Sequence, residues 1–215
     1  LQRAGQYLDY ISIHGYWDRL QHVNNPSDYL TCMRFSVMPE SRIQNTIAIL
    51  KQTGYDKKIK IAFDEWNLRS WHHPGHGSRF EEQDIKARDL NDDNSTYTMA
   101  DALFSASFLN SCLRNSDYVS MACMAPVVNT RGPLFVYPGG IVKRSTFHVM
   151  SMYSNLLQPN ILPVQINSDI LSVPSANRQI TIPAVDAIVT CSDDKKTLSI
   201  AVVNKNPEKP VEIDL

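Results

Sequence analysis

Side chains that can do chemistry gather where two short apolar runs of the sequence end. They comprise an imidazole, two carboxylates, an amide and three aromatic rings: His14, Tyr16, Trp17, Asp64, Glu65, Trp66 and Asn67. Aromatic rings can cover the apolar face of a sugar, while carboxylate, amide and imidazole groups bind its hydroxyls. These residue types therefore indicate a carbohydrate pocket.

Glu65 is the candidate for covalent chemistry. It directly follows an apolar run, so a rigid strand would hold its carboxylate in place, as a nucleophile or a general acid requires. In retaining glycoside hydrolysis one carboxylate attacks the anomeric carbon and a second protonates the leaving group. Asp64 precedes Glu65 on the same strand, so we expect its side chain on the opposite face, as a structural hydrogen-bond acceptor. The alternative for both carboxylates is a helix cap or a surface ion pair.

Two further groups of polar residues are open to more than one interpretation. His14 could simply bond to the backbone, but Gly15 and Tyr16 beside it favour contact with a ligand. A third apolar run, residues 119–129, ends in Asn129, which Arg131 and a Gly-Pro turn follow.

A histidine-rich segment raises the possibility of a metal site. Zinc favours imidazole ligands, and the segment contains His72, His73 and His76. The spacing does not match a helix-borne HExxH pattern, and Pro74 would break a helix. We therefore expect a polar loop over the pocket, in which Trp71 faces the sugar, and no metal or organic cofactor.

The elements that must position these side chains alternate between strand and helix. Apolar spacing predicts helices over residues 40–53, 95–115 and 145–156, the second capped by Ser95 or Thr98. The three apolar runs predict strands between them. Strands that alternate with amphipathic helices imply a parallel sheet buried on both faces, with its functional side chains at the carboxyl ends of the strands.

The pattern changes near residue 158. Short strands with polar turns follow, so we expect an α/β domain over residues 1–158 and part of a β-sandwich over residues 159–215.

Composition excludes several classes of protein. The chain has 215 residues and a formal net charge of −1, which does not favour a nucleic-acid partner. No window is apolar enough for a membrane span, and the four cysteines form no CxxC pair.

Because the sequence starts at Leu1 without an initiator methionine, we expect a piece of a longer protein. The compartment stays open between secreted or periplasmic and cytoplasmic.

The motifs resemble those of a known family. YISIHGYW, IAFDEWN, the helix TMADALFSASFLNSCLRNSD and VSMACMAPVVNTRGPLF are together similar to the family 51 glycoside hydrolases, the α-L-arabinofuranosidases. The resemblance covers nearly the whole chain. It implies a retaining, commonly oligomeric enzyme with a (β/α)₈ TIM barrel and a β-sandwich, of which this chain supplies the C-terminal barrel units and part of the sandwich.

The resemblance also implies roles for individual residues. Glu65 matches the nucleophile, and His14 and Tyr16 match the contacts to the arabinofuranosyl ring. Trp66 and Asn67 match pocket-wall and supporting positions, whereas Trp71 matches a pocket residue only if the loop is shifted.

Two features depart from the family pattern. A threonine follows Asn129 where many members have glutamine, and the Asn-Glu motif that carries the acid/base carboxylate is absent.

The sequence therefore predicts the nucleophile half of an enzyme that releases α-L-arabinofuranosyl residues from polysaccharides or oligosaccharides. Three alternatives stay open. They are a non-catalytic carbohydrate-binding or scaffold protein, a xylosidase or endoglucanase of the same barrel clan, and a metal-dependent hydrolase that uses the histidine-rich segment.

Overall fold

A computed structural model describes residues 1–18, 27–69, 97–173, 175 and 179–214 of the chain. A short 3₁₀-helix, Gly5–Tyr7, precedes a three-stranded parallel sheet in the order β1-β2-β3. These strands are β1 (Tyr10–Asp18), β2 (Lys60–Arg69) and β3 (Val119–Met124). Four helices accompany the sheet: α1 (Tyr29–Phe35), α2 (Met38–Gln52), α4 (Met99–Arg114) and α5 (Ser145–Leu156).

The remaining strands pair antiparallel. The sheet β10-β9-β6 is formed by β6 (Asn160–Leu162), β9 (Val185–Cys191) and β10 (Leu198–Asn204). The other four strands form two separate two-stranded antiparallel sheets. One pairs β4 (Leu134–Tyr137) with β5 (Gly140–Lys143), and the other pairs β7 (Ile170–Val173) with β8 (Ile180–Pro183). Among the described residues no helix is long and apolar enough to cross a membrane.

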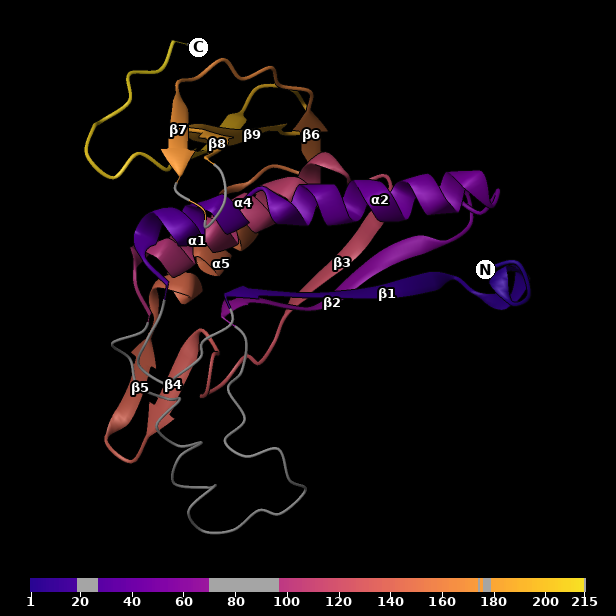
Figure 1. The fold of residues 1–215 in the computed structure, drawn as a ribbon, viewed down its shortest axis with the longest axis horizontal. Helices are drawn as coiled ribbons and strands as arrows, with labels where there is room; N and C mark the ends of the chain where they lie inside the picture. Colours follow the sequence, from indigo (N-terminus) through magenta and orange to yellow (C-terminus); the bar gives the residue numbers. More distant parts are fainter. Residues whose placement is uncertain (19–26, 70–96, 174, 176–178, 215) are drawn as a thin grey trace.

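The helices form a layer between the two larger sheets (Figure 1). Helix α4 lies in the middle of it and contacts β2 and β3 on one side and β9 and β10 on the other. Because it is covered from both sides, even polar residues of α4 are buried, and Ser105 and Ser111 donate to the carbonyls four residues before them. The packing of α4 thus joins the α/β part to the β-rich part.

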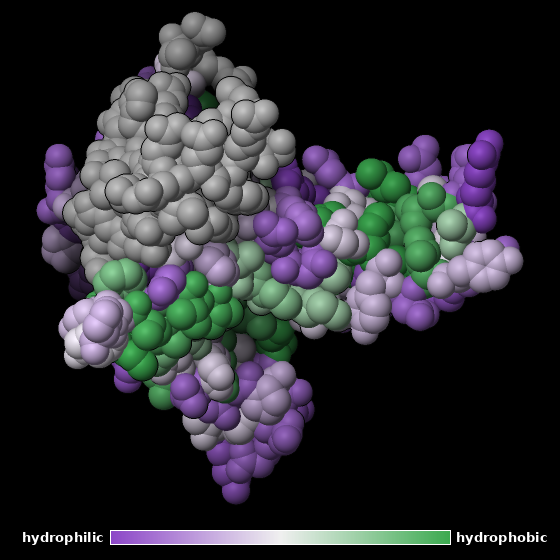
Figure 2. Space-filling model, turned by 90° about the horizontal axis from the view of Figure 1, so that it is seen from below, coloured by the Kyte–Doolittle hydropathy of each residue, from purple (hydrophilic) through white to green (hydrophobic). Residues whose placement is uncertain are grey.

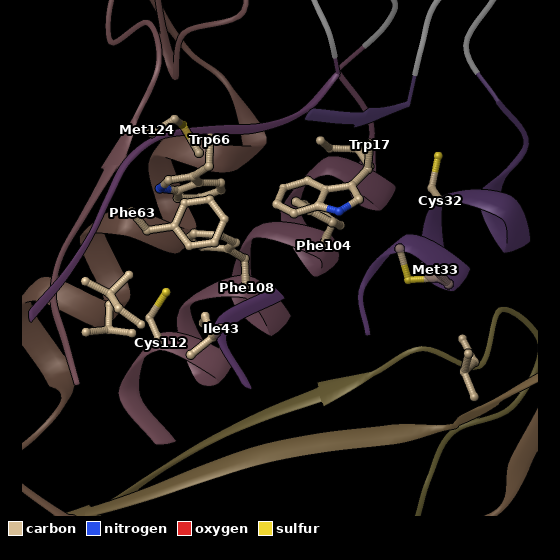
Figure 3. Packing of buried hydrophobic residues seen from close by; sticks show 14 of the residues in the cluster. Trp17, Cys32, Met33, Ile43, Phe63, Trp66, Phe104, Phe108, Cys112 and Met124 are labelled. Carbon is tan, nitrogen blue, oxygen red and sulfur yellow. The ribbon is translucent and has the colours of Figure 1, made fainter. Parts of the chain in front are cut away.

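Aromatic rings fill the space between α4 and the parallel sheet. Phe108 of α4 stacks on Trp66 with ring centroids 3.8 Å apart and meets Phe63 edge-on at 4.8 Å. Trp17 lies 5.0 Å from Phe104 in the same cluster (Figure 3). Each ring removes a large apolar area from water, so this cluster fixes the sheet against α4.

The predicted helices and the parallel sheet are confirmed, with boundary shifts of a few residues. Helix α1 and the hairpin of β4 and β5 were not predicted, since each element is short and adjoins turn-forming residues, Asn24–Asp28 before α1 and Pro138–Gly140 within the hairpin. The division at residue 158 stays a prediction.

The prediction that both faces of the parallel sheet are buried is wrong for the described residues. Helices cover one face only, and on the other Tyr10 and Met121 are exposed (Figures 1 and 2). In Figure 2 this open face extends to the right, with apolar and polar surface side by side. Cys123 is exposed as well, because it also belongs to this face.

A buried ion cluster joins β1, β2 and α4 at the carboxyl ends of the strands. Arg69 donates two hydrogen bonds of 2.9 Å to Asp101, in bidentate fashion, and one of 2.5 Å to Asp18. All three residues are at most 3% exposed. Burial opposes the charge of the Arg69 guanidinium, but its hydrogen bonds and its attraction to Asp101 outweigh this and raise its pKa. The cluster therefore ties both strand ends to the first turn of α4.

Thr98, one of the two residues that the sequence offered as a cap, is the N-cap of α4. Its hydroxyl accepts from the Ala100 amide, and the Asp101 carboxylate accepts from the Thr98 amide, which completes a capping box. We expect Thr98→Ala to lower the free energy of unfolding by about 1 kcal/mol, because the first turn of the helix loses a partner. Urea unfolding measures this; Thr46→Ala inside α2 is a comparison that removes a hydroxyl without removing a cap. An unchanged midpoint for Thr98→Ala would contradict the assignment.

Candidate active site

Glu65 and His14 lie side by side on two neighbouring strands of the parallel sheet. They are paired in register on β2 and β1, and His14 Nδ1 lies 3.2 Å from Glu65 Oε2. The Tyr16 hydroxyl donates a hydrogen bond to the other carboxylate oxygen, Oε1. Both oxygens of Glu65 are therefore held, while 40% of its side chain stays open to solvent. The carboxylate is both oriented and accessible.

A register shift between β1 and β2 brings Asp64 to the same side of the sheet as Glu65. One residue of β1, Ile13, stands opposite two residues of β2. Consequently Phe63 and Trp66 point into the core, and both Asp64 and Glu65 contact the ring of His14. The prediction that the two carboxylates lie on opposite faces is wrong, because it assumed a regular strand.

Asp64 is nevertheless a hydrogen-bond acceptor, as expected. Its Oδ1 accepts from the Ser12 hydroxyl at 2.7 Å and lies 3.3 Å from His14 Nε2. The hydrogen bond from Ser12, followed by the attraction of His14, lowers the pKa of the exposed Asp64 carboxyl. Burial, together with the hydrogen bond and the negative charge of Glu65, raises the pKa of Tyr16, so its hydroxyl keeps its proton at neutral pH.

Trp66 and Asn67 lie behind the open face. The Trp66 ring has no exposed surface and packs on Phe108 (Figure 3). Asn67 is buried as well, and its amide donates to the carbonyls of Arg131 at 2.9 Å and of Ala125 at 3.3 Å. Both residues support the strand and the segment after β3. They do not face solvent beside Glu65, so direct sugar contact stays a prediction without geometric support.

The segment that follows β3 forms a tight turn. Asn129 and Thr130 both adopt positive φ angles, of 54° and 43°, and the Asn129 side chain accepts from the Val136 amide at 2.7 Å. At Gly132 an added Cβ would lie 2.5 Å from the Val127 carbonyl carbon, so only glycine fits this approach. Asn129 thus supports the base of the β4–β5 hairpin.

Two contacts of the site had not been predicted. Ser12 reaches Asp64, and Arg42 of α2 donates to the carbonyl of His14. The alternation of β1 places Ser12, His14 and Tyr16 on one face, so the period-2 pattern could have found Ser12. Nothing in the sequence relates Arg42 to His14.

The histidine-rich segment and Trp71 lie outside the described residues. Among the residues that the structure describes, no group of three or more His, Cys, Asp or Glu side chains is arranged to hold a metal ion.

Fold and site together define the class of protein. A parallel α/β sheet presents an accessible carboxylate fixed by a histidine and a tyrosine, and a β-rich part follows it in the chain. Carboxylates held in this way serve as nucleophiles in glycoside hydrolases. The family model of the alpha-L-arabinofuranosidase C-terminal domain matches residues 64–215. The chain belongs to this family, and the resemblance seen in the sequence is confirmed.

Curated relatives agree with the family. The chain is 30% identical over 213 residues to the intracellular exo-alpha-(1->5)-L-arabinofuranosidase 1 of Bacillus subtilis, a match that covers 95% of this chain and 40% of that protein. It is 28% identical to a probable alpha-L-arabinofuranosidase C of Aspergillus clavatus, covering 95% of this chain and 39% of the relative. The chain therefore spans about 40% of the length of the curated relatives it matches.

Solved structures share the fold. The GH51 alpha-L-arabinofuranosidase of Thermotoga petrophila superposes with a TM-score of 0.75 at 21% identity, covering 97% of this chain and 40% of that one. An arabinose complex of the Thermotoga maritima enzyme gives a TM-score of 0.72 at 22% identity, covering 95% and 39%.

Proposed function

We propose that this chain carries the nucleophile half of a retaining α-L-arabinofuranosidase, as the C-terminal part of a longer protein. The observation that carries the proposal is the Glu65 carboxylate, held by Tyr16 and His14 on adjacent parallel strands. Tyr16 orients one oxygen and His14 the other, so the carboxylate needs little reorganisation before it attacks. Membership of the arabinofuranosidase family supports the same assignment.

The reaction would proceed in two steps. Glu65 attacks the anomeric carbon of the arabinofuranosyl unit, the glycosidic bond breaks, and a proton from the acid carboxylate goes to the leaving oxygen. Water then hydrolyses the glycosyl-enzyme ester with the second carboxylate acting as base. This second carboxylate would come from outside the chain, and we expect the isolated 215 residues not to complete turnover.

The open sheet supports a barrel as the surrounding fold. Parallel sheets are normally covered on both faces, yet β1, β2 and β3 expose one face, and β1 and β3 each have one neighbour among the described strands. We propose that β1–α5 are the last βα units of a (β/α)₈ barrel, within residues 1–158. Residues 159–215 would form part of the β-sandwich.

A glycoside screen tests the proposed substrate class. The whole protein is expected to cleave nitrophenyl α-L-arabinofuranoside, and α-(1→5)-linked arabinofuranosyl oligosaccharides by analogy with the B. subtilis relative. Preference for a xyloside or a glucan would assign it to another retaining glycosidase. Binding of arabinose-containing oligosaccharide without hydrolysis would make it a carbohydrate-binding protein. Homo-oligomerisation stays a prediction.

Tyr16→Phe is expected to lower kcat/KM about 10- to 100-fold, because one hydrogen bond to the charged nucleophile is lost. Initial rates on nitrophenyl α-L-arabinofuranoside measure the effect. Tyr10→Phe provides the matched control, since Tyr10 is exposed at the other end of β1. Equal rates for Tyr16→Phe and the wild type would show that the tyrosine does not hold the nucleophile.

A further inference from the structure

A cavity of about 290 Å³ lies where the helices of the α/β part meet the β-rich part. The start of α2 and the end of α4 form one side of it, and the residues around the start of β9 form the other. This volume is near the lower end of the range of pockets that take small molecules. Much of the wall is apolar: Val37, Val164, Ile166, Pro183 and Val185. The described lining includes none of the active-site residues, so the cavity is a separate feature of the fold.

A buried lysine, Lys205, belongs to this wall. It directly follows β10 and is 2% exposed. Its backbone is fixed, since its amide donates to the Ala184 carbonyl at 2.8 Å and its carbonyl accepts from the Tyr29 hydroxyl at 3.0 Å. Within the described chain its ammonium group has no hydrogen-bond or ion-pair partner. A buried ammonium of this kind is costly, because its hydration is lost without a compensating hydrogen bond.

The other charged residues of the wall are paired with one another. Arg114 lies 2.7 Å from Asp186 Oδ1 and 3.5 Å from Glu40 Oε2, and Asp186 also accepts from Asn110 at 3.2 Å. Neither carboxylate lies within ion-pair distance of Lys205. Burial lowers the pKa of Lys205, and the attraction of Asp186, which Arg114 opposes, does not restore it. The described residues therefore leave this one cation of the wall without a direct counter-charge.

We propose that the cavity binds a small carboxylic acid with an apolar body, whose carboxylate pairs with the ammonium of Lys205. The carboxylate supplies the acceptors that the wall does not, and hydrogen bonds between two charged groups are stronger than neutral ones. The apolar body would lie against Val164, Ile166 and Val185. The site is independent of the proposed glycosidase chemistry, because it uses no residue of the active site. A ligand that binds only the folded protein stabilises it, here at the junction of its two parts.

Butyrate is the probe, because it combines a carboxylate with a short apolar chain. The measurement is the thermal unfolding midpoint of the whole protein in sodium butyrate, compared with sodium chloride of equal ionic strength. At about 50 mM butyrate, a Kd of about 1 mM would raise the midpoint by about 2 °C. Butyramide has the same chain without the charge and should leave the midpoint unchanged.

Lys205→Met removes the charge and keeps the apolar stem, so the rise with butyrate should disappear. Lys209→Met, the loss of an exposed lysine shortly after it, is the matched control and should keep the full rise. Equal rises in Lys205→Met and the wild type, an equal rise with butyramide, or no rise in the wild type would each overturn the proposal.

A second variant keeps the test open if Lys205→Met does not fold. Ile166 is exposed at the edge of the cavity, so Ile166→Trp would fill the space while Lys205 stays in place. The rise with butyrate should then be lost, and an undiminished rise would count against the site. None of these results bears on Glu65, because they measure stability and the nucleophile is tested by activity.

Discussion

Replacing Glu65 by glutamine is expected to lower kcat/KM by about 10⁴-fold or more in the whole protein, with the fold unchanged. The amide is nearly isosteric with the carboxylate but has no charge to attack the anomeric carbon, and losing a nucleophile removes covalent catalysis entirely. The side chain is partly exposed and packs on no hydrophobic cluster, so little stability is lost. Rates on nitrophenyl α-L-arabinofuranoside together with the circular dichroism spectrum measure both effects.

A smaller residue at position 65 makes the test specific for a nucleophile. In Glu65→Gly, added azide can enter the vacated space and attack the anomeric carbon directly. One displacement in place of two would give a glycosyl azide of inverted configuration. Glu208→Gln, at an exposed site in the β-rich part, is the matched control and should keep full activity. A fully active Glu65→Gln enzyme would exclude the nucleophile role.

The sequence was sufficient to predict the helices in which apolar residues recur at regular spacing. Helix α5 has the predicted bounds, and α2 and α4 differ by a few residues at their ends, because apolar residues recur along one face and Thr98 marks a start. The sequence could not show that one face of the parallel sheet is open. Whether a face is open depends on which elements cover the sheet. The strands of a parallel sheet read as continuous apolar runs, without an alternation of polar and apolar residues that would mark one face as exposed.

The candidate site was predictable as a set of residues but not as a geometry. His14, Tyr16 and Glu65 were found because polar side chains follow apolar runs in the sequence. The contact of Asp64 with His14 was missed, since a single register shift reverses the face on which a side chain lies. Burial of Trp66 and Asn67 was also not predictable, because it depends on α4 and on the segment after β3.

Arg69→Met is expected to have the largest effect on stability, a loss of about 3–5 kcal/mol in the free energy of unfolding. The substitution keeps the volume of the side chain but removes the cation that neutralises Asp18 and Asp101, each of which is almost completely buried. Two buried carboxylates would then stay close together in a region of low dielectric constant without the guanidinium of Arg69. Urea unfolding followed by tryptophan fluorescence measures the loss, since Trp17 and Trp66 lie in the adjoining core.

The comparison with Arg3→Met distinguishes a buried ion cluster from a general loss of positive charge. Arg3 is exposed, so its replacement should change stability by less than about 0.5 kcal/mol. The double variant Asp18→Asn/Arg69→Met should be less destabilised than the sum of the two single variants, because Asp18→Asn removes one of the two negative charges that the guanidinium of Arg69 balances. Since Asp18 and Arg69 end the strands that carry His14 and Glu65, the double variant should also regain part of any activity lost in Arg69→Met. Additive losses would show that Arg69 contributes through packing and not through its charge.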